Sequence, residues 1–597
     1  MTGARDFTTR PEICGSFGMV ASTHWLASAA GMAVLEQGGN AFDAAVAAGF
    51  VLQVVEPHMN GLGGEVPIIG YSAEDAEVFV VNGQGPVPAA ASIGAFEDLG
   101  LDLVPGSGLL AACVPGAFDA WMVLLDRWGS LAFPEVLGYA IGYATNGFPL
   151  AHGTAEAVAE VEGLFTEEWT DSAAIYLHQG LPSPGERFLN RALANTYERL
   201  VREATAGTND RSGQIGRARD CFYRGFVAEE IAGYCAESKV MDSSGRRHRG
   251  LLTAGDMDVF EAQVEPPVTF DYHDYTVCKT GPWGQGPVLL QQLSLLRGLD
   301  VGSMAPESAE LIHVVTESAK LAFADREAWY GDPSFSDVPL PELLAEGYAA
   351  ERRALIHDDA SLELLPGSVA GREPRMPPWR DLGTASSAGE GTGEPLSNLG
   401  VAPGDTCHLD IADRWGNVVS ATPSGGWLQS SPVIPGLGFP LGTRAQMAWL
   451  MPGLPNSLAP GARPRTTLSP SFALGPAGER IAFGTPGGDQ QDQWPLLFFL
   501  GHVHFGRNMQ EAIDAPAWHS EHFPSSFYPR DARPGVLVVE NRIPEDVRED
   551  LRGRGHVIEV SDAWSLGRTC AVAVDSKNGW LKGAANARGM QGYAQGR

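Results

Sequence analysis

The segment TCHLDIADRWGNVVSAT, residues 406–422, is the most informative part of this chain. From 406 to 411 its polar and apolar residues alternate, which is the period of a half-buried β-strand. The run DRWGN at 413–417 can turn the chain, and 418–422 can return beside the first strand. We therefore predict a β-hairpin whose first strand begins at Thr406.

The residues before this hairpin have a different composition. Over 365–405 glycine, proline, serine and threonine dominate and hydrophobic periodicity disappears, so we expect a loop or linker. A strand that starts directly after a linker is the arrangement that a self-cleaving N-terminal-nucleophile enzyme needs. Cleavage before Thr406 would free its amine, and the cut end of the linker could then leave the site.

Thr406 is a candidate nucleophile because a threonine at a chain terminus carries its own base. An α-amino group has a pKa of about 7.7–8.0, so no histidine partner is required. The strand pattern taken alone favours a simpler interpretation, a polar residue at the start of a hairpin. Cys407 and His408 cannot form a nucleophile–base pair, because neighbours on a strand point to opposite faces. We expect Cys407 in the core and His408 as a hydrogen-bonded structural residue.

A second candidate feature is the glycine-rich run GTPGGD at 484–489. Gly487 and Gly488 would let backbone N–H groups approach a developing oxyanion, although a tight turn explains the same run. No Lys-Ser or Lys-Thr follows, which disfavours nucleotide binding. Asp489 and Asp492 stand among glutamines, so we expect them in a structural hydrogen-bonded run.

Two adjacent threonines lie in the proline-flanked run RPRTTLSP at 463–470. The hydroxyls of Thr466 and Thr467 can either stabilise a turn or face a substrate, so this motif is uninformative by itself. The sequence contains neither a G-x-S-x-G elbow nor an H-E-x-x-H zinc pair.

Composition and charge narrow the class of partner. The chain has 597 residues, of which 44% are hydrophobic, so it can bury a large core. Its net charge of -31 would repel nucleic acid and anionic lipid, and we therefore expect a small-molecule partner. No apolar run of the length of a signal peptide or membrane span occurs, which predicts a soluble, cytoplasmic protein. The seven cysteines are scattered without a C-x-x-C pair, so we expect no disulfide framework.

Local patterns predict helices before sheet in the first half of the chain. The predicted elements are helices at 25–36 and 41–54, a glycine-rich loop at 56–64, a strand at 66–71, mostly helical structure over 107–147 and a long amphipathic helix over 309–330.

Taken together, these motifs resemble the γ-glutamyltranspeptidase family, and the resemblance runs from about residue 20 to the end of the chain. The matching runs, in the family's order, are GGNAFDAAVA at 38–47, VEP at 55–57, GLGG at 61–64, VPG at 114–116, FYRG at 222–225, LTAGD at 252–256, KLAFADR at 320–326, GDP at 331–333 and the processing site TCH at 406–408 with DRWGN at 413–417.

The resemblance implies chemical roles for individual residues. The precursor would be cut between Asp405 and Thr406, and Thr406 would then be the nucleophile. Gly487 and Gly488 match the paired glycines whose N–H groups hold the oxyanion. Ser424 stands where the family has a threonine that supports the nucleophile, and this exchange keeps the hydroxyl. The implied mechanism needs no metal or organic cofactor.

The substrate pocket departs from the family's pattern. The family grips the α-carboxylate and α-amine of a γ-glutamyl group with an arginine, an asparagine and an aspartate. By ungapped comparison Asn82 replaces the arginine, Gly426 the asparagine and Met447 the aspartate, so we expect γ-glutamyl amides to be poor substrates. We expect four residues to contact the substrate: Thr466, Thr467, Asn82 and Arg444. Thr466 and Thr467 replace two serines that bind a carboxylate in the family. Arg444 could receive a carboxylate placed elsewhere, although a structural ion pair is the commoner use of an arginine.

The family's architecture implies an α+β fold, a four-layer αββα sandwich with two antiparallel sheets between helical layers. It divides the chain into a large-subunit region (1–364), a linker ending at the cleavage site (365–405) and a small-subunit region (406–597), interwoven in one globular domain. The two fragments of the precursor are expected to associate, and two such heterodimers could pair further.

We therefore expect a γ-glutamyltranspeptidase-like self-processing amidohydrolase or acyltransferase that acts on a small amide or acyl substrate. One alternative is a specialised acylase or a secondary-metabolism homologue, as in antibiotic biosynthesis, that cleaves a C–C bond next to a carbonyl. Another is a non-catalytic, unprocessed homologue that only binds a ligand. An uncut chain on a denaturing gel would distinguish this last class.

Overall fold

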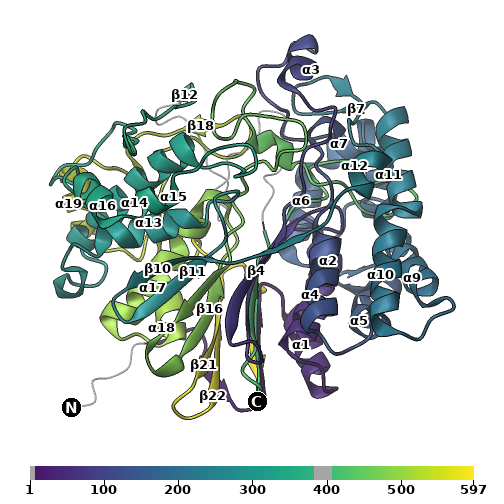
Figure 1. Ribbon diagram of the computed structural model, residues 1–597, viewed down its shortest axis with the longest axis horizontal. Coiled ribbons are helices and arrows are strands. Elements are labelled where there is room, and N and C mark those ends of the chain that lie inside the picture. Colours follow the sequence, from purple (N-terminus) through teal and green to yellow (C-terminus); the bar gives the residue numbers. More distant parts are fainter. Residues whose placement is uncertain (1–6, 379, 382–405) are drawn as a thin grey trace.

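Two seven-stranded β-sheets pack against each other at the centre of the molecule, and helices lie on both sides of the pair (Figure 1). The structure is a computed structural model that describes residues 7–378, 380–381 and 406–597, without the side chains of 380 and 381. In both sheets every neighbouring pair of strands is antiparallel.

Each sheet combines strands from before and after residues 365–405. The first sheet has the order β23 (Tyr593–Gly596), β2 (Gly18–Ser22), β13 (Leu409–Asp413), β14 (Val418–Ala421), β3 (Val66–Ser72), β4 (Glu77–Gly83), β9 (Gln263–Glu265). The second has the order β1 (Ile13–Gly15), β22 (Trp580–Ala585), β21 (Cys570–Asp575), β16 (Arg480–Gly484), β15 (Ser471–Leu474), β11 (Tyr275–Lys279), β10 (Val268–Tyr272).

Small sheets lie outside this pair. They are β17 (Trp518–Ser520), β19 (Val536–Glu540) and β20 (Val557–Ser561), and the two-stranded pairs β5 (Phe148–Pro149) with β6 (Arg187–Phe188), β7 (Val240–Met241) with β8 (Arg247–His248), and β12 (Arg380–Asp381) with β18 (Asp531–Ala532).

The helices form two groups on opposite sides of the sheets (Figure 1). On the side of the first sheet lie α1 (Trp25–Glu36), α2 (Ala41–Val55) and α4 (Ala117–Trp128), which contact its strands, and then α5 (Phe133–Asn146), α9 (Arg191–Thr205), α10 (Arg211–Tyr223) and α11 (Phe226–Glu237). On the side of the second sheet lie α13 (Pro287–Leu296), α14 (Ala309–Trp329), α17 (Trp494–Phe505), α18 (Met509–Asp514) and α19 (Glu545–Gly553). The shorter helices are α3 (Ile93–Asp98), α6 (His152–Glu160), α7 (Glu162–Glu167), α8 (Thr170–Tyr176), α12 (Ala254–Asp258), α15 (Leu340–Leu343) and α16 (Glu346–Arg353).

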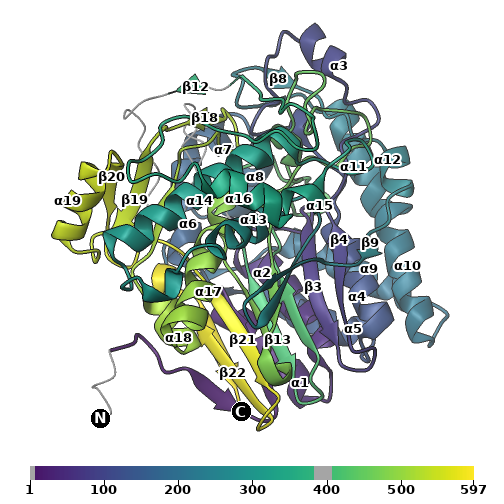
Figure 2. The same ribbon diagram turned by 60° about the vertical axis from the view of Figure 1, so that its left-hand side comes forward.

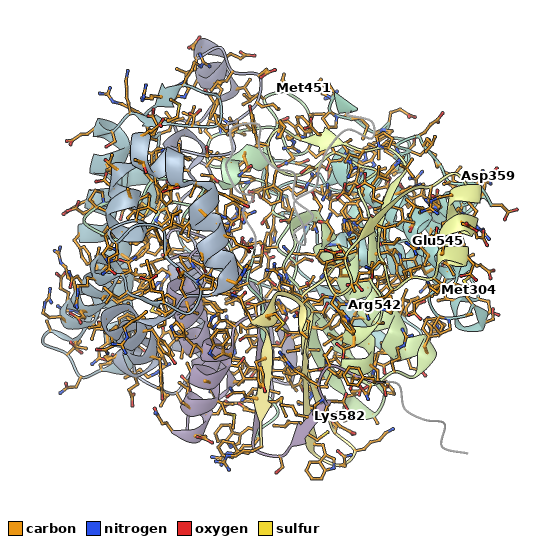
Figure 3. All side chains as sticks on the ribbon, turned by 180° about the vertical axis from the view of Figure 1, so that it is seen from behind. Met304, Asp359, Met451, Arg542, Glu545 and Lys582 are labelled. Atoms are coloured by element: carbon orange, nitrogen blue, oxygen red, sulfur yellow. The ribbon has the colours of Figure 1, made fainter. Side chains whose placement is uncertain are left out.

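A turned view shows α17 and α18 close to the strands β21 and β22 (Figure 2). The exposed residues Met451, Asp359 and Glu545 lie at the outer edge of the molecule (Figure 3). Large apolar side chains fill the three interfaces instead, two between sheet and helices and one between the sheets.

The predicted elements are confirmed within a residue or two at most boundaries. The start of α2 shows the local cause, because the Asn40 side chain accepts from the N–H groups of Phe42 and Asp43 while Asp43 accepts from the N–H of Asn40. The hairpin is also confirmed, with Leu409 opposite Ala421. The mixed helix-and-sheet class is thus confirmed.

The first hairpin strand differs from its prediction in two respects. Thr406 makes only an isolated bridge to Ser424, and the regular strand β13 begins at Leu409 instead. It is buried on both faces, whereas the alternating pattern predicted a half-buried strand. One face packs against the helices of the first group and the other against the second sheet. The polar residues on the second face satisfy one another, because His408 Nε2 lies 3.0 Å from the Asp410 carboxylate and His408 Nδ1 lies 2.9 Å from Thr422 Oγ1. His408 is therefore structural, as predicted.

None of the seven cysteines, all of which lie within the described residues, forms a disulfide bond. Among the described residues, no helix is both long and apolar enough to cross a bilayer. Residues 365–378 contain no helix or strand, and most of the remaining predicted linker lies outside the described residues.

Candidate active site

Thr406, Ser424 and Glu65 form a row across three neighbouring chain segments at the end of the first sheet. Thr406 pairs with Ser424 in an antiparallel bridge just before β13. Ser424 pairs in turn with Glu65, with backbone hydrogen bonds of 2.9 and 3.0 Å in the two directions. All three residues are buried, with at most 3% of each exposed. Backbone pairing with Ser424 therefore fixes the position of Thr406.

The hydroxyl of Thr406 lies between two polar side chains. Thr406 Oγ1 donates to Ser424 Oγ at 3.2 Å, and it accepts from Gln491 Nε2 at 3.4 Å. The Gln491 carbonyl oxygen accepts from the N–H of Ser469 at 3.1 Å, which orients the amide with its nitrogen toward Thr406. The oxygen of Thr406 thus has a donor on one side and an acceptor on the other.

Arg444 connects the other two members of the row. It belongs to the 3₁₀ turn η3 (Arg444–Met447). Its Nη2 donates to Ser424 Oγ at 2.9 Å, and its Nε donates to the Glu65 carboxylate. Burial raises the pKa of the Glu65 carboxyl, and the Arg444 guanidinium opposes that rise. The charge of Arg444 is therefore matched inside the protein.

The predicted glycine loop lies beside Thr406. It leads into the 3₁₀ turn η5 (Gly488–Asp492), which contains Gln491. Gly487 has φ +116 and Gly488 has φ +53, which L side chains rarely adopt, and a Cβ at Gly487 would lie 2.3 Å from the Trp494 ring. The first N–H groups of a helical turn have no intrahelical partner, so this end of η5 can offer donors.

The two aspartates of this segment are structural, as predicted. Asp489 pairs with Arg326 and accepts from both the hydroxyl and the N–H of Ser526, at 2.6 and 2.8 Å. Asp492 pairs with the buried Lys279 at 3.0 Å. These ion pairs fasten η5 to the elements around it.

Thr466 and Thr467 lie near η5. They closely precede Ser469, whose N–H donates to the side chain of Gln491 in η5. The Thr466 hydroxyl accepts from the N–H of Leu468 at 3.3 Å, and its backbone pairs with the segment at Gly284. The Thr467 hydroxyl is buried and has no hydrogen-bond partner among the described residues. Thr467 is thus the threonine with an available hydroxyl.

An apolar cluster stands beside Arg444. It consists of Trp427, Met447 and Phe527, and the guanidinium carbon of Arg444 lies 5.1 and 5.8 Å from the centroids of the two aromatic rings. The third nitrogen of Arg444, Nη1, lies 3.8 Å from the Met447 sulfur. The residue at 447 therefore contributes an apolar wall and no anion.

Gly426 leaves little room for a side chain. It has φ +66, and a Cβ there would lie 3.1–3.2 Å from backbone atoms of Gly63, Gly64 and Pro440. A side chain such as that of asparagine would therefore need this backbone to move by a few tenths of an ångström.

Asn82 lies on β4, two strands away from β14. Its side-chain oxygen accepts from the N–H of Gln84 at 3.1 Å, and its side chain also hydrogen-bonds Glu265. No hydrogen bond joins it to Thr406, Ser424 or η5 within the described part of the chain. The predicted cleavage partner Asp405 lies outside the described residues.

Sequence reasoning did not single out Glu65 or Gln491. Glu65 directly follows the quoted GLGG run, and Gln491 follows the glycine pair by three positions. Each adjoins a candidate motif, and that adjacency was the signal available.

In the described residues one cluster has the geometry to hold a metal ion, His313, Glu317 and His556. The ammonium of Lys320 lies 2.6 Å from the Glu317 carboxylate, so a cation is already present there. His313 Nδ1 and His556 Nε2 are hydrogen-bonded at 2.9 Å. None of these contacts involves Thr406, Ser424 or Gln491.

Comparison with known proteins gives consistent matches over nearly the whole chain. A family model described as gamma-glutamyltranspeptidase matches residues 27–596. The glutathione hydrolase proenzyme of Bacillus subtilis (strain 168) is 28% identical, covering 96% of this chain and 90% of its own. The acylase ACY 1 proenzyme of Pseudomonas sp. (strain SE83) is 30% identical, covering 97% of this chain and 94% of its own.

Two solved structures share the fold. The structure of LmbA2991HD has a TM-score of 0.93 and 54% identity, covering 99% of this chain and 100% of that one. The cephalosporin acylase from Bacillus halodurans has a TM-score of 0.81 and 27% identity, with both chains covered completely at 100%.

Proposed function

The chain belongs to the γ-glutamyltranspeptidase family of enzymes, and on that basis we propose that it is a self-processing amidohydrolase or acyltransferase with Thr406 as its nucleophile. The observation that carries this proposal is the position of the Thr406 hydroxyl, held between Ser424 and Gln491 just before β13 begins. The relatives named proenzymes support the processing step.

Self-cleavage makes the catalytic group. Thr406 Oγ attacks the carbonyl carbon of Asp405, the peptide C–N bond breaks and an ester forms. Water then opens the ester, which leaves Asp405 as a carboxylate and Thr406 with a free α-amine. The new terminus has a base with a pKa of about 7.7–8.0 next to its own hydroxyl.

The same hydroxyl then acts on substrate. The α-amine takes the proton from Thr406 Oγ as the oxygen attacks the substrate carbonyl, and later gives it to the leaving amine. We assign the N–H groups of Gly487 and Gly488 to the developing oxyanion, because η5 begins there beside Thr406. Ser424 supports the nucleophile through its hydroxyl. Water or an acceptor amine releases the acyl group.

The acyl pocket is proposed to accept groups other than γ-glutamyl. A charged head group would lose its hydration without finding an anion at Met447 or an amide at Gly426. Thr466, Thr467 and Arg444 remain the proposed polar contacts, with Thr467 offering the available hydroxyl and Arg444 the nitrogen next to Met447. Asn82, on β4, lies further from this group of contacts and is the weakest of the assignments.

A specialised acylase is the second candidate, because the apolar cluster of Trp427, Met447 and Phe527 suits an apolar acyl group. Two of the similar proteins are named acylases, which supports an acylase activity.

We also propose the four-layer αββα arrangement for this fold, in keeping with the two helical groups that flank the paired sheets (Figure 1). In that arrangement regions 1–364 and 406–597 stay associated after cleavage, because each sheet contains strands of both.

A covalent trap tests the proposed chemistry. A panel of acyl esters and amides is mixed with purified enzyme, quenched in acid and examined by mass spectrometry. The account expects the acyl mass on the fragment that begins at Thr406, and none on Thr406→Ala. Acylation of another residue at the turnover rate would refute Thr406 as the nucleophile.

A further inference from the structure

We infer that Glu65 and Arg444 are positioning residues that hold Ser424 as a hydrogen-bond acceptor for Thr406. This inference rests on the proposed role of Thr406 and adds two residues to it. In the described part of the chain neither residue is hydrogen-bonded to the Thr406 hydroxyl, so both act through Ser424.

The first step of the inference concerns which groups donate hydrogen bonds to Ser424. A serine hydroxyl offers one donor and two acceptor sites, whereas a guanidinium only donates. Arg444 Nη2 therefore occupies one acceptor site of Ser424 Oγ at 2.9 Å, and Thr406 donates to the same oxygen at 3.2 Å. With these two donors directed at it, Ser424 Oγ is kept as the acceptor for the Thr406 hydroxyl.

The second step concerns Glu65, which holds Arg444 in place. An unpaired guanidinium with 2% exposure would be costly to bury, and the Glu65 carboxylate compensates its charge at Nε. Contacts at Nε and Nη2 fix the plane of the guanidinium, and the rings of Trp427 and Phe527 flank it. Arg444 thus has one orientation, which is the orientation that reaches Ser424.

Backbone pairing places Glu65 close to Ser424 and Arg444. Glu65 pairs with Ser424, and Ser424 with Thr406, so the three side chains stand in one row of the ladder. Glu65 comes from region 1–364 and Arg444 from region 406–597, so the ion pair also joins the two proposed fragments beside the nucleophile. Because the pair is neutral overall, it adds no net charge for an anionic acyl group, which points to neutral acyl groups as substrates.

The test begins with Glu65→Gln, which keeps size and removes charge. We expect kcat of the processed enzyme to fall about tenfold while KM changes less, since the orientation of Ser424 toward the nucleophile is disturbed and Arg444 itself is kept. The matched control is Glu317→Gln, another buried glutamate with one cationic partner, whose contacts are Lys320 and Ser361. It should lose stability without losing kcat. An unchanged kcat in Glu65→Gln would overturn the inference.

A double-mutant cycle separates positioning from general destabilisation. If Glu65 acts through Ser424, Glu65→Gln should cost nothing further in a Ser424→Ala background, whereas full additivity of the two losses in kcat would overturn the inference. If Glu65→Gln does not fold, the neutral pair Glu65→Gln with Arg444→Gln is used in the same cycle with the same two outcomes.

Wild type and Thr406→Ala run beside these variants. Turnover by Thr406→Ala equal to wild type would refute the proposed function. An inactive Thr406→Ala together with an additive cycle would refute only the role of Glu65 and Arg444.

Discussion

Thr406 donates a 3.2 Å hydrogen bond to Ser424 from the position just before the regular hairpin ladder of β13 and β14 begins. The two hydroxyls meet because the hairpin returns the chain beside its own starting point. The nucleophile is therefore positioned by the same ladder that forms the middle of the first sheet.

Ser424→Ala should slow turnover. Loss of this one hydrogen bond leaves the Thr406 hydroxyl without its acceptor, and we expect kcat to fall roughly tenfold. Ser424→Thr keeps the hydroxyl and should retain most of the activity. Steady-state kinetics of the two processed variants gives the answer, and equal activity of the alanine and threonine variants would exclude a role for this hydroxyl.

Gly488→Ala should impair chemistry more than binding. One oxyanion donor is typically worth about 2.7–4 kcal/mol in the transition state, so turnover should fall roughly a hundredfold or more. The change also places a side chain at φ +53. Gly506→Ala is the control, since Gly506 has φ +64 at the end of α17 and open space around it. A Gly488→Ala enzyme that is processed and fully active would remove η5 from the mechanism.

Gln491→Met should lower kcat with little change in KM. Methionine fills a similar volume but cannot donate to Thr406, so the hydroxyl loses the partner that lies 3.4 Å away. Gln493→Met is the matched control, because the Gln493 side chain bonds only the backbone of Ser520 among the described residues. Both variants should melt at lower temperature, and only the first should turn over more slowly. Equal kcat values for the two would argue against a role at the nucleophile.

The substrate preference follows from Gly426 and Met447. Glutathione and γ-glutamyl-p-nitroanilide should have lower kcat/KM than neutral, apolar acyl amides, because Met447 offers no anion to an α-ammonium group. The comparison uses processed enzyme with Thr406→Ala as the blank. If the γ-glutamyl compounds have the highest kcat/KM, the acyl pocket contains anchors other than the residues assigned here.

Sequence predicted the elements whose causes are local. The capping box at Asn40 and the turn at 413–417 both act within a few residues, so their patterns are visible in the chain itself. The contact between Glu65 and Arg444 joins residues 379 positions apart, and no local pattern announces it. The amide of Gln491 likewise contacts Thr406 only once η5 has folded against it, so no local pattern predicts that contact.

Burial of β13 on both faces illustrates the same limit. The alternation at 406–411 indicates that one face of the strand is polar. The polar side chains of such a face can form hydrogen bonds either with water or with neighbouring side chains. Here His408 and Asp410 satisfy each other beneath the second sheet, a solution that depends on tertiary packing.

The mass of the freshly purified protein tests the central claim most directly. Cleavage between Asp405 and Thr406 would divide the 597 residues into fragments of 405 and 597 − 405 = 192 residues. We expect these two fragments, with Thr406 as the new N-terminus of the smaller one, and an intact chain for Thr406→Ala. A small fragment that begins at another residue, or an active enzyme that remains one uncut chain, would contradict the account.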